Sequence, residues 1–217
     1  HRVDRRQRQM CIRDSTYTNR AAGELRSRLR TLGVGAVSVR TFHAAALAQL
    51  EYFWPQLVGV PAPSILDSKA KLIGMAAKSL SINLDNAALR DMASEIEWRK
   101  YSMLSMDEYA ELSEIRPKVA GLSFQKNLEI QKLYEQEKIR AQKLDWEDVL
   151  VLTLGLLKAE PRALAHVQSQ YRFFTVDEYQ DISPLQHALL DQWLGQHADL
   201  CVVGDPNQTI YSFTGAS

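Results

Sequence analysis

The stretch Phe173-Phe-Thr-Val-Asp-Glu-Tyr-Gln-Asp181 decides the fold class of this chain. Its first four residues are an apolar run of the kind that forms a short buried strand, and the acidic pair after them marks the strand's carboxyl end. Ser183-Pro184 predicts the start of a helix that ends at Gly195, because serine caps helices and proline fits their first turn. A second apolar run, Leu200-Cys-Val-Val203, predicts another buried strand. Strand, helix and strand in this order predict a parallel α/β sheet, in which ligands bind at the carboxyl ends of the strands.

The middle of the chain predicts a separate helical unit. Residues 64–144 show no strand pattern, and Asp85, Ser105 and Ser123 are candidate N-caps of helices that end near residues 98, 115 and 144. Asp145 is a candidate cap of the apolar helix that follows. We therefore expect an α/β domain formed by 16–63 and 145–217, with an all-α subdomain inserted at 64–144. The charges of Tyr134–Lys143 favour a solvated helix face over a DNA surface.

The N-terminal part begins with an irregular segment. Residues 1–15 have no helical or strand period and contain five arginines and two aspartates. Arg13 and Asp14 would place charges inside a strand, at a cost on the order of several kcal/mol unless they are paired. We therefore expect residues 1–15 to be a leader foreign to the rest. Beyond them, the pattern predicts a helix at 19–32 that Gly33 stops, a strand at 34–39 and a helix at 44–52, with a break marked by Pro55, Pro61 and Pro63.

Composition sets the broad class of protein. The 217 residues are 46% hydrophobic and 24% charged, as in ordinary globular proteins, and carry no formal net charge. No stretch approaches the roughly 20 apolar residues that span a membrane. The two cysteines and five histidines have no metal-binding spacing. These features predict a cytoplasmic protein with no membrane partner. Any binding of nucleic acid must depend on local residues, since the chain has no overall basic charge.

Asp177 and Glu178 are the candidate catalytic pair. Mg²⁺ takes one or two carboxylates and keeps waters and phosphate oxygens as its other ligands, which suits Asp177. Glu178 could orient or deprotonate an attacking water. An isolated Asp-Glu pair after a strand is more often a surface turn than a catalytic site. The interpretation therefore depends on the residues that follow the end of the second predicted strand. Beyond it, Gln208 offers an amide to a phosphate oxygen or water, and Tyr211 and Phe213 offer rings on which bases could stack.

Five strings together resemble the superfamily 1 DNA helicases of the UvrD, PcrA and Rep type. Asp177–Asp181 and Val203–Ala216 are similar to motifs II and III of that family. Thr16–Leu25 resembles motif Ia, and Thr41–Ala44 resembles the next DNA-contacting motif. Asp145–Leu150 resembles the segment that precedes motif II. The strings follow the family's order, and the Tyr-Ser-Phe-Thr-Gly ending is most similar to a UvrD-like branch of actinobacteria.

The resemblance implies a fold, cofactors and roles for individual residues. It implies a RecA-like ATPase domain, called 1A in the family, formed by 16–63 and 145–217, with 64–144 as the 1B subdomain. ATP and Mg²⁺ would be the cofactors. Asp177 would bind Mg²⁺, Glu178 would be the catalytic carboxylate, and Gln208 would link the γ-phosphate to the DNA site. The implied DNA contacts are Tyr17, Thr18, Asn19, Thr41, His43, Tyr211 and Phe213. Thr214 departs from the family, because many relatives have an arginine there.

The sequence contains no Gly-x-x-x-x-Gly-Lys-Ser/Thr phosphate loop. Together with the resemblance, this absence leads us to expect a fragment. The resemblance implies that its parent is a 3′-to-5′ DNA helicase that couples ATP hydrolysis to translocation on single-stranded DNA and to unwinding at single-strand/double-strand junctions, in DNA repair or replication. The fragment alone should be inactive, because the C-terminal motor domain would be missing as well. Two alternatives are the motor subunit of a helicase-nuclease in DNA end resection and a non-catalytic DNA-binding derivative.

Overall fold

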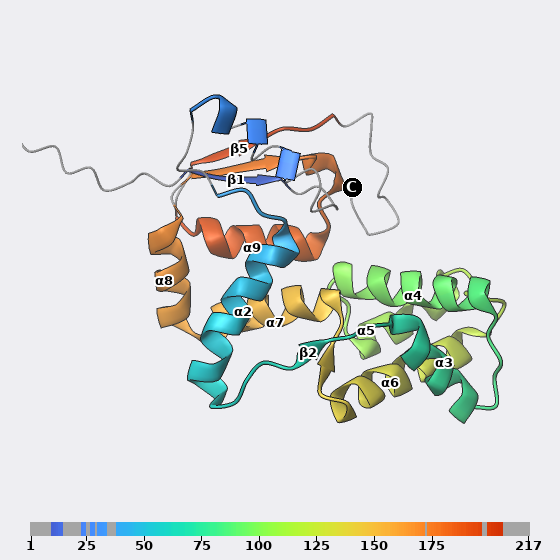
Figure 1. Cartoon of the computed structure of the whole chain (residues 1–217). Coiled ribbons are helices and arrows are strands. Elements are labelled where there is room, and N and C mark those ends of the chain that lie inside the picture. The colour runs from blue at the N-terminus through green and yellow to red at the C-terminus, as the bar shows by residue number, and fades with distance from the viewer. Residues whose placement is uncertain are drawn as a thin grey trace, which may run out of the picture.

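The computed structural model of the chain describes residues 10–14, 23–24, 27–28, 30–33, 38–171, 173–196 and 199–205. These residues form two lobes that contact one another (Figure 1). One contains a small parallel sheet with helices beneath it, and the other is formed by helices; we call them the sheet lobe and the helical lobe. The expected α/β class is confirmed at this level, as a largely helical chain with small parallel sheets.

The sheet lobe is organised around three parallel strands. They are β1 (Met10–Asp14), β4 (Phe173–Asp177) and β5 (Leu200–Val202), in the order β1-β4-β5. The register places Asp14 opposite Asp177 and Val176 opposite Val202. The parallel pairing of the two apolar runs is therefore confirmed. Because all three strands run the same way, their carboxyl ends meet at one edge of the sheet.

Two expectations about the strands were wrong. No strand was expected within residues 1–15, yet β1 lies there, paired with β4. The charge argument assumed an interior strand, and among the described strands β1 has a neighbour on one side only. The second buried strand, β5, is instead exposed, with Val202 48% exposed. Among the described strands, β5 has only β4 as a neighbour.

The sheet lobe also contains the helices α2 (Phe42–Val58), α7 (Trp146–Ala159), α8 (Pro161–Gln170) and α9 (Pro184–Leu194). They pack in one hydrophobic core around Trp193, which is fully buried and stacks on Phe42 with ring centroids 5.5 Å apart. Helix α9 begins at Pro184 and ends before Gly195, as predicted. Helix α2 continues through Pro55, where a break was expected. The proline lies in its last turn, and its carbonyl accepts a hydrogen bond from Gly59, so little helix is lost.

The helical lobe has a hydrophobic core of its own. Its helices are α3 (Lys69–Ser79), α4 (Asn86–Tyr101), α5 (Met106–Ala110), the 3₁₀ turn η1 (Glu111–Glu114) and α6 (Phe124–Arg140). Ile73, Met92, Ile96, Ile130 and Tyr134 are fully buried among them. Two short strands, β2 (Ser64–Ile65) and β3 (Lys143–Leu144), pair in parallel where the chain enters and leaves this lobe. They were not predicted, because two residues carry no periodicity.

The predicted helix caps are confirmed where the structure describes them. The side chains of Asp85, Ser105, Ser123 and Asp145 each accept a hydrogen bond from the first turn of the helix that follows. In the predicted helix at 19–32, the described residues 23–24, 27–28 and 30–31 are helical, and its cap lies outside the described residues. Of the strand expected at 34–39, residues 34–37 lie outside them, and Ser38 and Val39 are not in a strand. Within the described part of the chain, no helix has the length and apolar character needed to cross a membrane.

Candidate functional site

The carboxyl ends of β4 and β5 are joined by backbone hydrogen bonds. Val203 N donates to Val176 O at 2.8 Å, and Tyr179 N donates to Val203 O at 3.0 Å. Between these bonds the chain turns at Glu178, which has the left-handed conformation φ 51°, ψ 43°. This conformation is uncommon for a residue other than glycine, and it is typical of functional sites held by their surroundings. Asp177 is half-buried at this turn, and the Glu178 side chain is exposed.

Gln180 ties the two strand ends together through its side chain. Its Nε2 donates to Glu178 Oε2 at 2.6 Å, and its Oε1 accepts from Asp205 N at 3.1 Å. Asp177 Oδ1 accepts from Glu178 N at 3.0 Å. Gly204 lies against this group, since a Cβ there would collide with the Gln180 side chain and lie 3.1 Å from Tyr179 N. The acidic turn at the end of β4 and the Gly204-Asp205 segment after β5 therefore lie against each other, and glycine at 204 allows this contact.

The chemistry of this turn suits a magnesium–nucleotide site. Its two carboxylates follow directly after a strand, and one of them is exposed to solvent. Among the described residues there is no group of three or more side chains that could hold a metal ion on its own. Mg²⁺ does not require such a group, because one or two carboxylates together with waters and phosphate oxygens complete its octahedron. Asp177 and Glu178 therefore fit Mg²⁺ that arrives with a phosphate ligand, and fit a closed protein metal site poorly.

Thr41 and His43 lie at the amino end of α2. The Thr41 hydroxyl caps the helix by accepting from Ala44 N at 3.2 Å. The His43 ring contacts both lobes: its Nε2 is 3.3 Å from the Tyr101 hydroxyl on α4, and its edge meets the Trp146 ring at a centroid distance of 5.9 Å. Burial and the nearby Lys69 ammonium lower the pKa of His43 to about 4. His43 is therefore neutral at neutral pH and would contact a phosphate as a hydrogen-bonding group, not as a cation.

A network of buried charges connects the lobes. The carboxylate of Asp145 accepts hydrogen bonds from Lys100 Nζ (2.6 Å), Lys138 Nζ (2.9 Å) and the Tyr134 hydroxyl (2.8 Å). Asp148 pairs with the same two lysines. Burial alone would raise the pKa of Asp145, but Lys100 and Lys138 outweigh it and hold the pKa well below its usual range. The residues at the start of α7 thus fasten the sheet lobe to α4 and α6 of the helical lobe.

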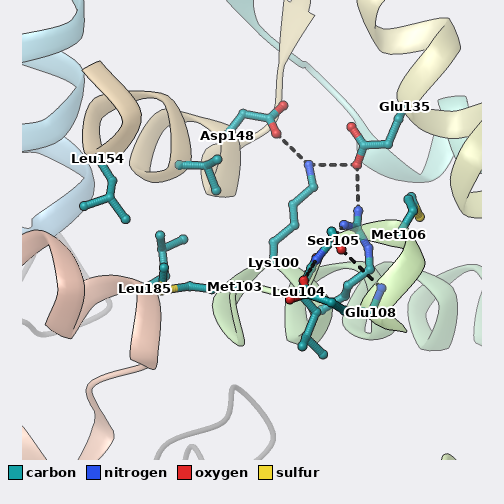
Figure 2. Close-up of a pocket in the computed structure, with 12 residues that line it drawn as sticks. Lys100, Met103, Leu104, Ser105, Met106, Glu108, Glu135, Asp148, Leu154 and Leu185 are labelled. Carbon is teal, nitrogen blue, oxygen red and sulfur yellow. Dashed lines mark hydrogen bonds and ion pairs between the residues drawn. The ribbon is translucent and has the colours of Figure 1, made fainter. Parts of the chain in front are cut away.

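A cavity of about 420 Å³ lies beside this network (Figure 2). Figure 2 shows Lys100 between Asp148 and Glu135 on one side of it, and Met103, Leu154 and Leu185 on the other. The charges on the wall pair with one another, so the cavity does not offer Lys100 as an unpaired cation. We assign the network a structural role in joining the lobes.

Sequence reasoning missed this junction. Tyr134 and Lys138 were expected on a solvated face, yet both are buried. The alternation of basic and acidic residues on α6 does not reveal that its partners are Lys100 on α4 and Asp145 at the start of α7. The sequence offered one signal of this junction: Asp145 is a candidate N-cap, and a second acidic residue, Asp148, follows three positions later.

The structure tests the placement of only some predicted site residues. Asp177 and Glu178 lie together at the turn after β4, and Thr41 and His43 lie together at the start of α2. The remaining candidates lie outside the described residues: Tyr17, Thr18, Asn19, Gln208, Tyr211 and Phe213. Their roles stay predictions, as does the foreign origin of residues 1–15.

The sequence is similar to known DNA helicases over nearly its whole length. It is 42% identical over 213 residues to the ATP-dependent DNA helicase UvrD2 of Mycobacterium tuberculosis, an alignment that covers 93% of this chain and 30% of that protein. It is 32% identical over 209 residues to the ATP-dependent DNA helicase PcrA of Leuconostoc citreum, with 93% and 27% covered. The chain thus spans about 30% of the length of the curated relatives it matches.

The family model of the UvrD/REP helicase N-terminal domain matches residues 5–217, a range that includes β1 and most of the segment expected to be foreign. The same range holds the turn after β4, the Gly204 contact and the start of α2. By this match, the chain belongs to the UvrD/REP helicase N-terminal domain family.

Proposed function

We propose that this chain is part of the first motor domain of an ATP-dependent DNA helicase, which we call the parent helicase. The parent helicase would couple ATP hydrolysis to 3′-to-5′ movement on single-stranded DNA and to unwinding at single-strand/double-strand junctions. The observation that carries the proposal is the acidic turn at the end of β4, where Gln180 joins Glu178 to the Gly204-Asp205 segment within a chain of this family. The names of the relatives, ATP-dependent DNA helicases, support the same activity.

In this proposal the sheet lobe is an incomplete RecA-like domain, formed by 16–63 and 145–217, and 64–144 is the inserted helical subdomain. Parallel strands whose carboxyl ends meet at one edge are the arrangement on which such domains bind nucleotides. Asp177 would hold Mg²⁺, which would neutralise charge on the phosphates. Glu178 would orient and deprotonate the attacking water. The hydrogen bond from Gln180 Nε2 holds the Glu178 carboxylate in place at the turn. A carboxylate that positions a water needs to be held in this way.

The DNA side of the proposal rests on the start of α2. Thr41 and His43 would contact the DNA backbone there, and contacts of this kind position DNA without reading its sequence. Tyr17, Thr18, Asn19, Tyr211 and Phe213 would add backbone and stacking contacts, and Gln208 would link them to the γ-phosphate. Stacking together with backbone contact is sequence-tolerant, as a translocating enzyme requires.

The test is strand separation by the parent helicase. Purified protein is mixed with fluorescently labelled duplexes that carry either a 3′ or a 5′ single-stranded tail, with ATP and Mg²⁺. We expect ATP-dependent release of the labelled strand from the 3′-tailed duplex alone. Shortened DNA products would favour a helicase-nuclease. Binding to the tailed DNA without ATP turnover or unwinding would favour a non-catalytic derivative and contradict the proposal.

A further inference from the structure

Tyr101 brings a hydroxyl group from the helical lobe to His43. It is the last residue of α4, and its hydroxyl oxygen lies 3.3 Å from His43 Nε2. Tyr101 is buried in the hydrophobic core of the sheet lobe, where its ring and the His43 ring meet edge to face at a centroid distance of 6.4 Å. The helical lobe therefore contacts directly, through one side chain, a residue that is proposed to bind the DNA backbone.

Both partners in this contact are held by their neighbours. Lys100, directly before Tyr101, donates to the buried carboxylate of Asp145 at 2.6 Å and so fastens the end of α4 to the start of α7. On the other side of His43, the Trp146 ring is perpendicular to the imidazole at a centroid distance of 5.9 Å. An imidazole held between two aromatic rings has little freedom to turn, so Nε2 stays directed at the Tyr101 hydroxyl.

The Tyr101 hydroxyl decides which nitrogen of His43 carries the proton. Burial and the Lys69 ammonium hold the pKa of His43 below its usual range, so the ring is neutral and has one N–H group and one acceptor nitrogen. A phenol donates more readily than it accepts, because its proton is acidic and its oxygen shares electron density with the ring. Tyr101 therefore donates to Nε2, and the proton of the imidazole lies on Nδ1.

The Nδ1–H group is available to an anionic partner. His43 is partly exposed, and its Nδ1 forms no hydrogen bond with any residue that the structure describes. The first turn of α2 contains no acidic residue, and the amino end of a helix carries partial positive charge. A phosphate is the acceptor that suits an N–H donor beside such a helix end.

We propose that Tyr101 is a positioning residue for DNA binding, which fixes the tautomer of His43 so that Nδ1–H donates to a phosphate of single-stranded DNA. The proposal rests on the proposed helicase function and deepens it, because it makes a DNA contact of the sheet lobe depend on the helical lobe. Tyr101 itself does not touch DNA. Without its hydroxyl, the imidazole can carry its proton on Nε2, and Nδ1 then presents a lone pair to the phosphate in place of a proton.

The first measurement identifies the tautomer directly, by the NMR chemical shifts of the imidazole nitrogens in the 217-residue chain at pH 7. The His43 signals are those that disappear in His43→Ala. We expect a protonated Nδ1 and an unprotonated Nε2 in the wild type, and a population protonated at Nε2 in Tyr101→Phe, which removes the hydroxyl and keeps the ring. Tyr109→Phe is the matched control, because Tyr109 is also a buried tyrosine of the helical lobe and donates its hydroxyl to Glu95 at 2.7 Å. This control should leave the His43 tautomer unchanged.

The second measurement is the affinity of the nucleotide-free parent helicase for fluorescent oligo(dT), followed by anisotropy. Tyr101→Phe should weaken binding by roughly 5-fold, as the loss of one hydrogen bond implies. In a His43→Ala background the same substitution should have no further effect, because Tyr101 acts through His43. Tyr109→Phe should bind DNA as the wild type does, and thermal melting monitored by circular dichroism checks that each variant is folded.

Three results would overturn the positioning role and leave the helicase proposal standing. They are a wild-type His43 protonated at Nε2, a tautomer that Tyr101→Phe leaves unchanged, and an affinity that Tyr101→Phe leaves unchanged or lowers equally with and without His43. A loss of affinity in Tyr109→Phe as large as that in Tyr101→Phe would also overturn it, since any lost tyrosine hydroxyl would then have the same effect. A wild-type parent helicase that does not bind oligo(dT) would overturn both proposals.

Discussion

Replacing Asp145 by asparagine should strongly destabilise the junction of the two lobes. The Asp145 carboxylate is 2% exposed and accepts hydrogen bonds from Lys100, Lys138 and the Tyr134 hydroxyl. Asparagine has nearly the same shape and is an equally good N-cap, but Asp145→Asn removes the charge and replaces one accepting oxygen by an NH2 donor. With the amide oxygen kept at the cap of α7, the NH2 group faces the donors of Lys100, Lys138 and Tyr134. The buried ammonium groups of Lys100 and Lys138 then have less negative charge beside them than in the wild type.

The expected size of the effect follows from burial. Removing one partner of a buried ion pair costs about 3–5 kcal/mol, mostly because the remaining charge stays desolvated. Glu135 and Asp148 still face both lysines, which places Asp145→Asn near the lower end, about 3 kcal/mol. Asp145→Ala should lose about 1 kcal/mol more, because it also removes the cap of α7.

Urea denaturation of the 217-residue chain, followed by far-UV circular dichroism at pH 7, measures these differences. Glu137→Gln is the matched control, since Glu137 forms an exposed ion pair with Arg140 on α6 and its loss should cost about 0–1 kcal/mol. The effect should also depend on pH. The pKa of Asp145 is lowered in the folded state, so its contribution is present above the unfolded pKa of about 3.9 and is lost as pH falls below it. An Asp145→Asn variant as stable as Glu137→Gln at pH 7 would refute this account of the junction.

Two further outcomes test the remaining features of the site. Gly204→Ala should destabilise the chain by about 1–3 kcal/mol, because the added Cβ meets Gln180 and the backbone of Tyr179. The control, Gly155→Ala, lies on the exposed side of α7 with open space around it and should stabilise the chain by about 0.5–1 kcal/mol. Equal effects of the two variants in urea denaturation would contradict the proposed close approach. In an NMR titration the His43 ring should protonate near pH 4, so that His43 contributes stability above its unfolded pKa of about 6.5 that is lost as pH falls towards 4; a midpoint near 6.5 would show that His43 is not buried at the junction.

The sequence predicts features that depend on neighbouring residues well. Helix caps at Asp85, Ser105, Ser123 and Asp145 are local chemistry, and each was placed correctly. The proximity of the carboxyl ends of β4 and β5 was also predictable, because parallel strands bring these ends to one edge of the sheet.

Features that depend on distant partners were not predictable. Whether a charged residue such as Lys138 is solvated or buried is decided by Asp145 and Asp148, which the pattern on α6 does not contain. The exposure of β5 depends on how many strands flank it, which an apolar run cannot specify. The strand at Met10–Asp14 was missed because charge inside a strand is most unfavourable where the strand is interior, and among the described strands β1 has only β4 beside it.

We propose that Glu178, at the turn after β4, activates the water that hydrolyses ATP in the parent helicase. The most direct test is steady-state ATP hydrolysis with oligo(dT) and Mg²⁺, measured together with the affinity for ATP, in Glu178→Gln. Glu114→Gln, an exposed residue of the helical lobe, is the control. If Glu178 activates the attacking water, Glu178→Gln should lose at least about 100-fold in turnover, in line with general base catalysis, and should bind ATP as the wild type does. Wild-type turnover in Glu178→Gln, or loss of ATP binding in place of turnover, would contradict the account.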